Sequence, residues 1–111
     1  MQTNRQKRIE RLLQKELGQI LQIEGRNWFL GTMVTVTKVT VTPDLGIAKI
    51  FVSIYGKDAS GAMQQIELRS KEIRRILGIQ VKNQLRVIPE LRFFVDDSLD
   101  YIENIEKLLR N

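Results

Sequence analysis

The sequence predicts an α+β fold, a two-layer sandwich in which helices cover one face of a three-stranded mixed sheet. Apolar residues recur at three- and four-residue steps in three segments, which is the spacing of amphipathic helices. Apolar and polar residues alternate in three other segments, as in strands with one buried face. No linker or repeat interrupts the 111 residues, so we expect a single domain spanning residues 1–111.

The first helix is predicted from Asn4 to about Glu24. Its apolar residues fall on one helical face: Ile9, Leu12, Leu13, Leu17, Ile20 and Leu21. Thr3 and Gln6 have the spacing of a capping box, which places the start of the helix there. Gly25 follows the last turn and is expected to end the helix in the left-handed conformation.

The segment after this helix carries the only tryptophan, Trp28, next to Phe29 and before Gly31. An indole at such a place either stacks on a nucleic-acid base or anchors the loop by hydrophobic contact. The hydrophobic anchor is the interpretation that we favour.

An antiparallel hairpin is predicted next, with strands Thr32–Thr42 and Ile47–Tyr55 around a turn at residues 43–46. The valines of the first strand change phase, with Val34 and Val36 on one face and Val39 and Val41 on the other. Because side chains alternate with a period of two, a bulge or strong twist near Thr37 and Lys38 would return all of them to the core. Partial cover of both faces is the alternative.

A second helical region follows, capped by Asp58 or Ser60. Its apolar positions are Met63, Ile66, Ile73, Ile76 and Leu77. The stripe is interrupted by the polar residues Arg69, Ser70 and Lys71, so this region is either one kinked helix or two shorter ones.

The third strand is predicted from Leu85 to Val95, where odd positions are apolar. Pro89 within it indicates an edge position or a bulge, because proline cannot donate to a ladder. We expect the preceding helix to bring this strand beside the first strand and parallel to it.

A last helix is expected from a cap at Asp97 or Ser98. Its apolar face consists of Leu99, Ile102, Ile105, Leu108 and Leu109. The acids Asp96, Asp97 and Asp100 could share a proton or hold Mg²⁺ through oxygen ligands. A helix cap is the interpretation that we favour, and no metal site is predicted.

Composition excludes many kinds of chemistry. The chain has no cysteine and no histidine, so it can form no disulfide, thiolate nucleophile, histidine base or imidazole metal site. Its glycines form neither a dinucleotide fingerprint nor a P-loop. Only carboxylate, lysine or tyrosine chemistry remains, so we expect most enzyme classes to be excluded and no cofactor to be used. The polar start and the lack of a long apolar run lead us to expect a cytoplasmic protein with no membrane partner. A monomer is our default expectation.

The formal charge of +5 is concentrated in two clusters. The first consists of Arg5, Lys7, Arg8, Arg11 and Lys15, and the second of Arg69, Lys71, Arg74, Arg75, Lys82 and Arg86. Such clusters either neutralise phosphates or are simply the solvated faces of helices. On the first interpretation the RNA-binding residues are the whole second cluster together with Arg5, Arg8 and Arg11, without base-specific contacts.

Four segments of the sequence resemble one family. They are R-I-E-R-L-L-Q-K-E-L, V-T-V-T-K-V-T-V-T-P-D-L-G-I-A-K-I-F-V-S, I-R-R-I-L-G and P-E-L-R-F-F-V-D-D-S-L. In these segments the chain resembles the ribosome-binding factor A proteins, small bacterial factors of small-subunit assembly. The resemblance extends over nearly the whole chain.

The resemblance implies a type II KH-like fold with the element order α-β-β-α-α-β plus a C-terminal helix. It implies binding to the free small (30S) ribosomal subunit and its rRNA, assistance to late maturation and to 16S rRNA processing near the 5′ end, and no catalysis. Family members usually carry A-x-G at the bend between the two middle helices, where this chain has Arg69, Ser70 and Lys71. Without that glycine we expect a milder bend and a more continuous helix.

Two other hypotheses remain. A basic interaction module could dock an acidic protein without touching RNA, and a shallow dependence of binding on salt would favour it. A small enzyme of the acylphosphatase type ranks last, because that fold begins with a strand and this chain begins with a helix.

Overall fold

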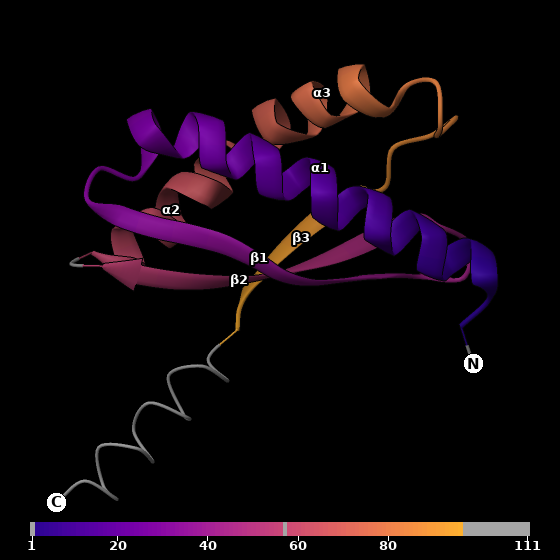
Figure 1. Cartoon of the computed structure of the whole chain (residues 1–111), viewed down its shortest axis with the longest axis horizontal. Coiled ribbons are helices and arrows are strands. Elements are labelled where there is room, and N and C mark those ends of the chain that lie inside the picture. Colours follow the sequence, from indigo (N-terminus) through magenta and orange to yellow (C-terminus); the bar gives the residue numbers. More distant parts are fainter. Residues whose placement is uncertain (1, 57, 97–111) are drawn as a thin grey trace, which may run out of the picture.

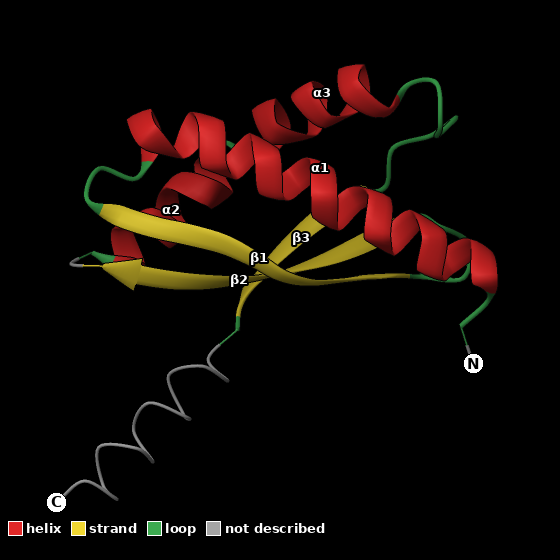
Figure 2. Cartoon of the chain, in the orientation of Figure 1, coloured by secondary structure: helices red, strands yellow, loops and turns green. Residues whose placement is uncertain are grey.

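The computed structural model describes residues 2–56 and 58–96. Along the chain it contains α1 (Asn4–Trp28), β1 (Thr32–Val41), β2 (Ile47–Gly56), α2 (Ala59–Leu68), α3 (Ser70–Val81) and β3 (Glu90–Val95). The three helices lie on one side of the sheet (Figures 1 and 2). The α+β class and the three-stranded mixed sheet are confirmed, whereas the predicted last helix and its cap lie outside the described residues.

The strand order is β1-β2-β3. Strand β1 pairs with β2 in antiparallel register, and β2 pairs with β3 in parallel register, from Ile47 opposite Glu90 to Val52 opposite Val95. The prediction that the third strand lies beside the first is therefore wrong. A helical crossover returns the chain parallel to the strand that it left, and here it returns to the adjacent free edge of β2.

Strand β3 is also shorter than predicted, because it begins at Glu90 rather than at Leu85. Pro89 has no N–H to offer a ladder, and Val87 before it is 73% exposed. The edge position that Pro89 indicated is confirmed, since β3 is an outer strand of the sheet.

The core lies between the sheet and the helices. Its most deeply buried side chains include Leu13, Leu17, Ile50, Ile66, Ile73 and Leu77. Burial of each such side chain contributes roughly 1.5–3 kcal/mol, so the helical stripes seen in the sequence are the main reason for this packing. The opposite face of the sheet carries the alternate residues, among them Lys49, Phe51 and Phe94.

The phase change of the valines in β1 is a bulge. The register shifts between Val36 and Lys38, and the valines on both sides of the shift are buried. The extra residue rotates the second half of β1 by one position, which keeps its apolar side chains in the core.

Helix α1 begins as predicted and ends later. The side chain of Thr3 accepts from the N–H of Gln6, and the capping box is complete. The helix continues to Trp28, so Gly25 lies inside it and does not end it. A Cβ at Gly25 would lie 2.9 Å from the ring of Phe29, so this glycine makes room for a buried aromatic ring rather than for a turn.

The middle helical region consists of two helices separated by Arg69. Of the predicted alternatives, two shorter helices are confirmed, and the expected more continuous helix is wrong. Arg69 has φ −99° and ψ 11°, a bridge conformation that needs no glycine. Its N–H bonds to the carbonyl of Gln65 and its carbonyl accepts from Ile73, so few backbone groups lose a partner at the break. Asp58 caps α2 by accepting from the N–H of Gly61, as one predicted alternative had it.

Candidate functional site

The solvent-facing side of α3 carries a row of cations. Residues Lys71, Arg75 and Lys82, here called the α3 stripe, are separated by four and seven positions and so share one helical face. The buried side of the helix is formed by Ile73, Leu77 and Val81. All three cations are exposed and form no ion pair or hydrogen bond within residues 2–56 and 58–96.

Helix α1 carries a second row on its outer side. Residues Arg8, Arg11 and Lys15, here called the α1 stripe, lie opposite the buried residues of the helix and are exposed. Arg5 is exposed one turn earlier. The first turn of α1 contains no acidic residue, although cations near a helix N-terminus are unfavourable. Local helix stability therefore does not account for these cations.

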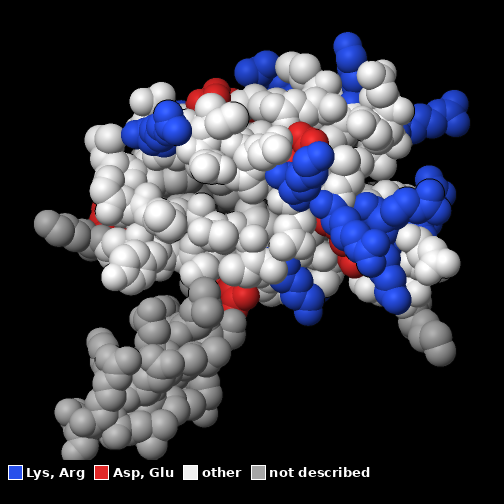
Figure 3. All heavy atoms as spheres, viewed as in Figure 1, with Lys and Arg blue, Asp and Glu red and all other residues white. Residues whose placement is uncertain are grey.

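The two stripes lie on adjoining helices, because α1 packs against α3. Figure 3 shows basic side chains gathered where α1 begins and along the edge formed by α3, whereas the left part of the same face is largely uncharged. Lys49 and Arg92 lie elsewhere, on the open face of the sheet.

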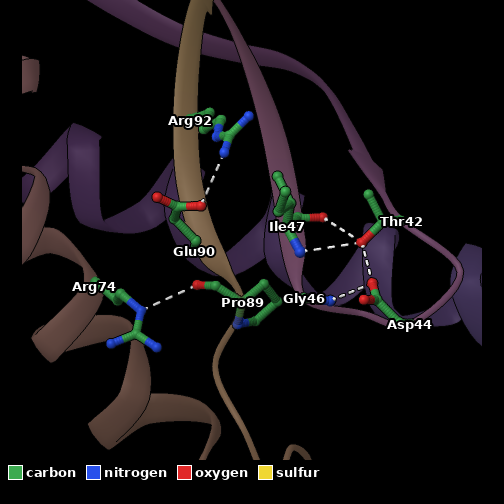
Figure 4. Close-up of polar contacts among 8 residues, drawn as sticks. All are labelled: Thr42, Asp44, Gly46, Ile47, Arg74, Pro89, Glu90 and Arg92. Carbon is green, nitrogen blue, oxygen red and sulfur yellow. Dashed lines mark hydrogen bonds and ion pairs between the residues drawn. The ribbon is translucent and has the colours of Figure 1, made fainter.

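Arg74 braces the chain rather than extending freely into solvent. Its Nε donates to the carbonyl of Pro89 at 3.1 Å (Figure 4). Its NH2 group donates to the carbonyl of Ile88 at 2.6 Å. These bonds fix the segment that enters β3. Arg74 has fewer donors left for a phosphate than Arg75 has.

Arg69 is held at the break between α2 and α3. Its guanidinium carbon lies 4.8 Å from the centre of the Trp28 ring, and its Nε donates to Gln65 at 3.1 Å. Arg69 also forms a weak ion pair with Glu72, with 3.6 Å between N and O. Trp28 also packs edge to face on Phe29, with 6.1 Å between ring centres. The favoured interpretation of Trp28 as an anchor agrees with this packing, but its partner Arg69 was not foreseen from the sequence.

Arg86 lies exposed in the segment between α3 and β3. It forms no ion pair within the described part of the chain. On the other side of β3, Arg92 is paired with Glu90 at 3.2 Å (Figure 4). Of the cations in this region, those of the α3 stripe and Arg86 therefore retain all their donors.

The hairpin turn holds a charge of the opposite sign. The carboxylate of Asp44 accepts from the hydroxyl of Thr42 at 2.7 Å and from the N–H of Gly46 at 3.0 Å (Figure 4). These bonds stabilise the charged form and lower the pKa of Asp44 below its ordinary value, with the bond from Thr42 as the larger cause. Leu45 beside it has a positive φ of 61°, which Asp44 helps to hold.

The sequence offers two interpretations of Asp96, Asp97 and Asp100, a site for a shared proton or Mg²⁺ and a helix cap. Asp96 accepts from the hydroxyl of Thr37 at 2.6 Å, and its N–H bonds to the carbonyl of Val52. Asp97 and Asp100 lie outside the described residues. Within residues 2–56 and 58–96 there is no group of three side chains suited to a metal ion. Across the same residues no helix has the length and apolarity needed to cross a membrane.

The fold and the surface together define a class: a small, basic α+β domain whose helices carry exposed cations on one side of a mixed sheet. A family model described as ribosome-binding factor A matches residues 5–109. The chain belongs to the ribosome-binding factor A family, which confirms the resemblance found in its sequence.

Known proteins support this assignment along nearly the whole chain. The chain is 42% identical over 111 residues to ribosome-binding factor A of Flavobacterium psychrophilum, and the alignment covers 98% of this chain and 85% of the relative. It is 43% identical over 111 residues to that of Christiangramia forsetii, with the same two shares.

Solved structures show the same fold. The crystal structure of ribosome-binding factor A from Thermus thermophilus superposes with a TM-score of 0.66 at 22% identity, covering 81% of this chain and 94% of that one. A Thermus thermophilus model fitted into a cryo-electron microscopy map of a complex with the 30S subunit has a TM-score of 0.64 at 21% identity. It covers 78% of this chain and 89% of that one.

Proposed function

We propose that this protein binds the free small (30S) ribosomal subunit through its rRNA and assists late maturation, including processing of 16S rRNA near its 5′ end, without catalysis. Membership of the ribosome-binding factor A family supports the proposal, as does the description of a Thermus relative in a 30S complex. We further propose that it acts as a cytoplasmic monomer.

The observation that carries the proposal is the pair of exposed cationic stripes on adjoining helices. Cations without intramolecular partners can exchange their counterions for phosphates, and the released ions provide the gain in free energy. The α3 stripe and Arg86 form the main contact, and Arg5, Arg8 and Arg11 form the second. Arg69 and Arg74 belong to the same contact, and their intramolecular bonds hold the elements that carry it.

The geometry suits a positioning role. A packed two-layer domain holds its helices rigidly, so it binds best to the RNA conformation whose phosphates match both stripes. Binding then shifts the population of rRNA toward that conformation by the difference in affinity between it and its competitors. Contacts to phosphates set the position of the protein on RNA but do not read its sequence.

Charge reversal on the α3 stripe tests the proposal. The variant Lys71→Glu/Arg75→Glu is expected to abolish co-sedimentation with free 30S subunits at moderate salt, because two attractive contacts become repulsive. The matched pair of single variants is Arg75→Glu and Lys49→Glu. Both change the charge equally, but Lys49 lies exposed on the opposite face of the sheet.

Arg75→Glu is expected to weaken binding about tenfold or more, and Lys49→Glu by less than about threefold. Far-UV circular dichroism checks that each variant folds. Equal effects of the two single variants would contradict the assigned surface. A slope of log affinity against log salt near zero would favour the alternative of an acidic protein partner, because RNA binding predicts roughly −0.7 for each phosphate contacted.

A further inference from the structure

Side chains from α1 cover one half of the free edge of β1. Gln6 donates to the carbonyl of Val41 at 3.2 Å, and the carboxylate of Glu10 accepts from the N–H of the same residue at 2.9 Å. One turn further, Gln14 donates to the carbonyl of Thr37 at 3.4 Å. Three residues spaced four apart thus bind three of the backbone groups that an edge strand would otherwise offer to another chain.

This row ends at Gly18, the next residue four positions along. Gly18 lies opposite the first half of β1, because helix and strand run in opposite directions from Gln6 beside Val41 to Gln14 beside Thr37. With no side chain at Gly18, no described residue of α1 hydrogen-bonds to the backbone of residues 33–36. Among residues 2–56 and 58–96, nothing from α1 covers the edge of β1 there.

No packing requirement in the described structure explains this glycine. A Cβ at Gly18 would have no atom within 4 Å, and the residue lies in the interior of a 25-residue helix, where glycine is less stable than alanine. Gly25, by contrast, is needed by the ring of Phe29. The space at Gly18 is therefore retained at a cost in helix stability.

A groove of about 840 Å³ opens at this place between α1 and β1. Residues 32–36, five consecutive residues of β1, line it. Side chains of consecutive residues point to opposite faces of a strand, so all five can border one groove only along the edge of the strand. Its lining includes Phe29 and Val34, with Lys15 and Arg26 from α1 and no acidic residue. Figure 3 shows the corresponding surface as largely uncharged.

We propose that this groove binds an extended segment of another protein, apolar and acidic, that pairs with residues 33–36 of β1 as a fourth strand. Main-chain hydrogen bonds to the open edge provide affinity, and alternate apolar side chains enter the groove beside Gly18. Carboxylates on the remaining positions face Lys15 and Arg26. This site is separate from the α3 stripe, shares only Lys15 with the α1 stripe, and does not depend on the proposed binding of rRNA.

The test uses the full chain and a defined probe, an acetylated ten-residue peptide of alternating valine and glutamate, with a lysine-containing peptide of the same pattern as control. The acidic peptide is expected to bind and to slow hydrogen exchange of those backbone amides in residues 33–36 that face away from β2. Nuclear magnetic resonance detects the slowed exchange, and fluorescence anisotropy of a labelled peptide gives the dissociation constant.

Two substitutions at one position separate the groove from the helix. Gly18→Ala and Gly18→Gln both remove the glycine from the helix, but only glutamine continues the row that covers the edge. Gly18→Gln is expected to weaken binding at least about tenfold, and Gly18→Ala by less than about threefold. Circular dichroism is expected to show that both variants fold.

Several results would overturn the proposal. They are equal binding of the acidic and basic peptides, unchanged binding by Gly18→Gln, and protection, in the peptide-free chain, of those amides in residues 33–36 that face away from β2. Such protection would mean that another segment or a second copy already occupies the groove. Protection by an rRNA fragment in place of the peptide would also contradict it. Failure of rRNA binding is recognised separately, because Arg75→Glu is expected to leave peptide binding unchanged.

Discussion

The basic cluster on α1 and the second basic cluster, from Arg69 to Arg86, contain five and six cations but use them differently. In α1, Arg8 and Arg11 extend from the solvent side, and neither has a described intramolecular partner. In the second region, Arg74 binds two backbone carbonyls and Arg69 lies over the ring of Trp28. Only the α3 stripe and Arg86 resemble α1 in having all their donors exposed.

This difference shows that a cluster of basic residues in a sequence can contain two populations. Engaged cations hold elements together, so their loss lowers stability. Exposed cations contribute little to stability, because a surface charge without a partner gains little from folding. Removing an engaged cation should therefore lower the free energy of unfolding more than it weakens RNA binding. Removing an exposed cation should do the reverse.

The largest expected effect separates the two exposed stripes. Replacing Lys71, Arg75 and Lys82 with glutamine is expected to weaken binding to an rRNA fragment about a hundredfold and to make the salt slope shallower by about 2, because three phosphate contacts disappear. The same replacement of Arg8, Arg11 and Lys15 is expected to cost about tenfold. Fluorescence anisotropy at several KCl concentrations measures both. A larger loss from the α1 variant would reverse the assignment of the main contact.

The next effect compares an engaged arginine with its exposed neighbour. Arg74→Ala is expected to lower the free energy of unfolding by about 1–2 kcal/mol, because two charge-assisted hydrogen bonds to the segment before β3 are lost. Arg75→Ala is expected to change it by less than about 0.5 kcal/mol. Urea denaturation of the two variants measures the difference. Equal unfolding free energies would mean that the Arg74 bonds contribute nothing to stability.

The sequence predicted those parts of the fold that depend on local pattern. The capping box at Thr3, the bulge after Val36 and the cap at Asp58 depend on neighbouring residues, and all three are confirmed. The position of the third strand depends on which sheet edge the returning chain reaches, and no local pattern records that. The same limit explains why Gly25 was wrongly predicted to end the helix. Its role depends on the ring of Phe29, which packs against it only in the folded chain.

The candidate site was predictable as a list of cations but not as a surface. Helical spacing alone places Lys71, Arg75 and Lys82 on one face. The engagement of Arg74 depends on Pro89, fifteen residues away, and that of Arg69 depends on Trp28, at the end of another helix. Contacts between residues so distant in sequence leave no periodic signal, so only the structure separates engaged cations from exposed ones.

A smaller effect is expected at Arg69. Arg69→Gln is expected to lower the free energy of unfolding by about 0.5–1 kcal/mol, because the cation over the Trp28 ring is lost at a partly exposed site. Arg69→Lys should retain part of this stabilisation. The fluorescence of Trp28, the only tryptophan, reports the change in its surroundings directly. An unchanged emission spectrum in Arg69→Gln would show that the two side chains are not in contact in solution.

The smallest effect concerns Asp44, an engaged charge of opposite sign. Because its pKa is lowered in the folded chain, the turn gains stability above the ordinary pKa of aspartate and loses it as the pH falls through the lowered value. Thr42→Val removes the larger cause and is expected to raise the pKa of Asp44 toward the ordinary value. Nuclear magnetic resonance titration of the carboxyl group below pH ~5 measures the midpoint in both proteins. Since Asp44 is fully exposed, the shift reports hydrogen bonding rather than burial, and an equal midpoint in Thr42→Val would show that the Gly46 N–H alone holds the charge.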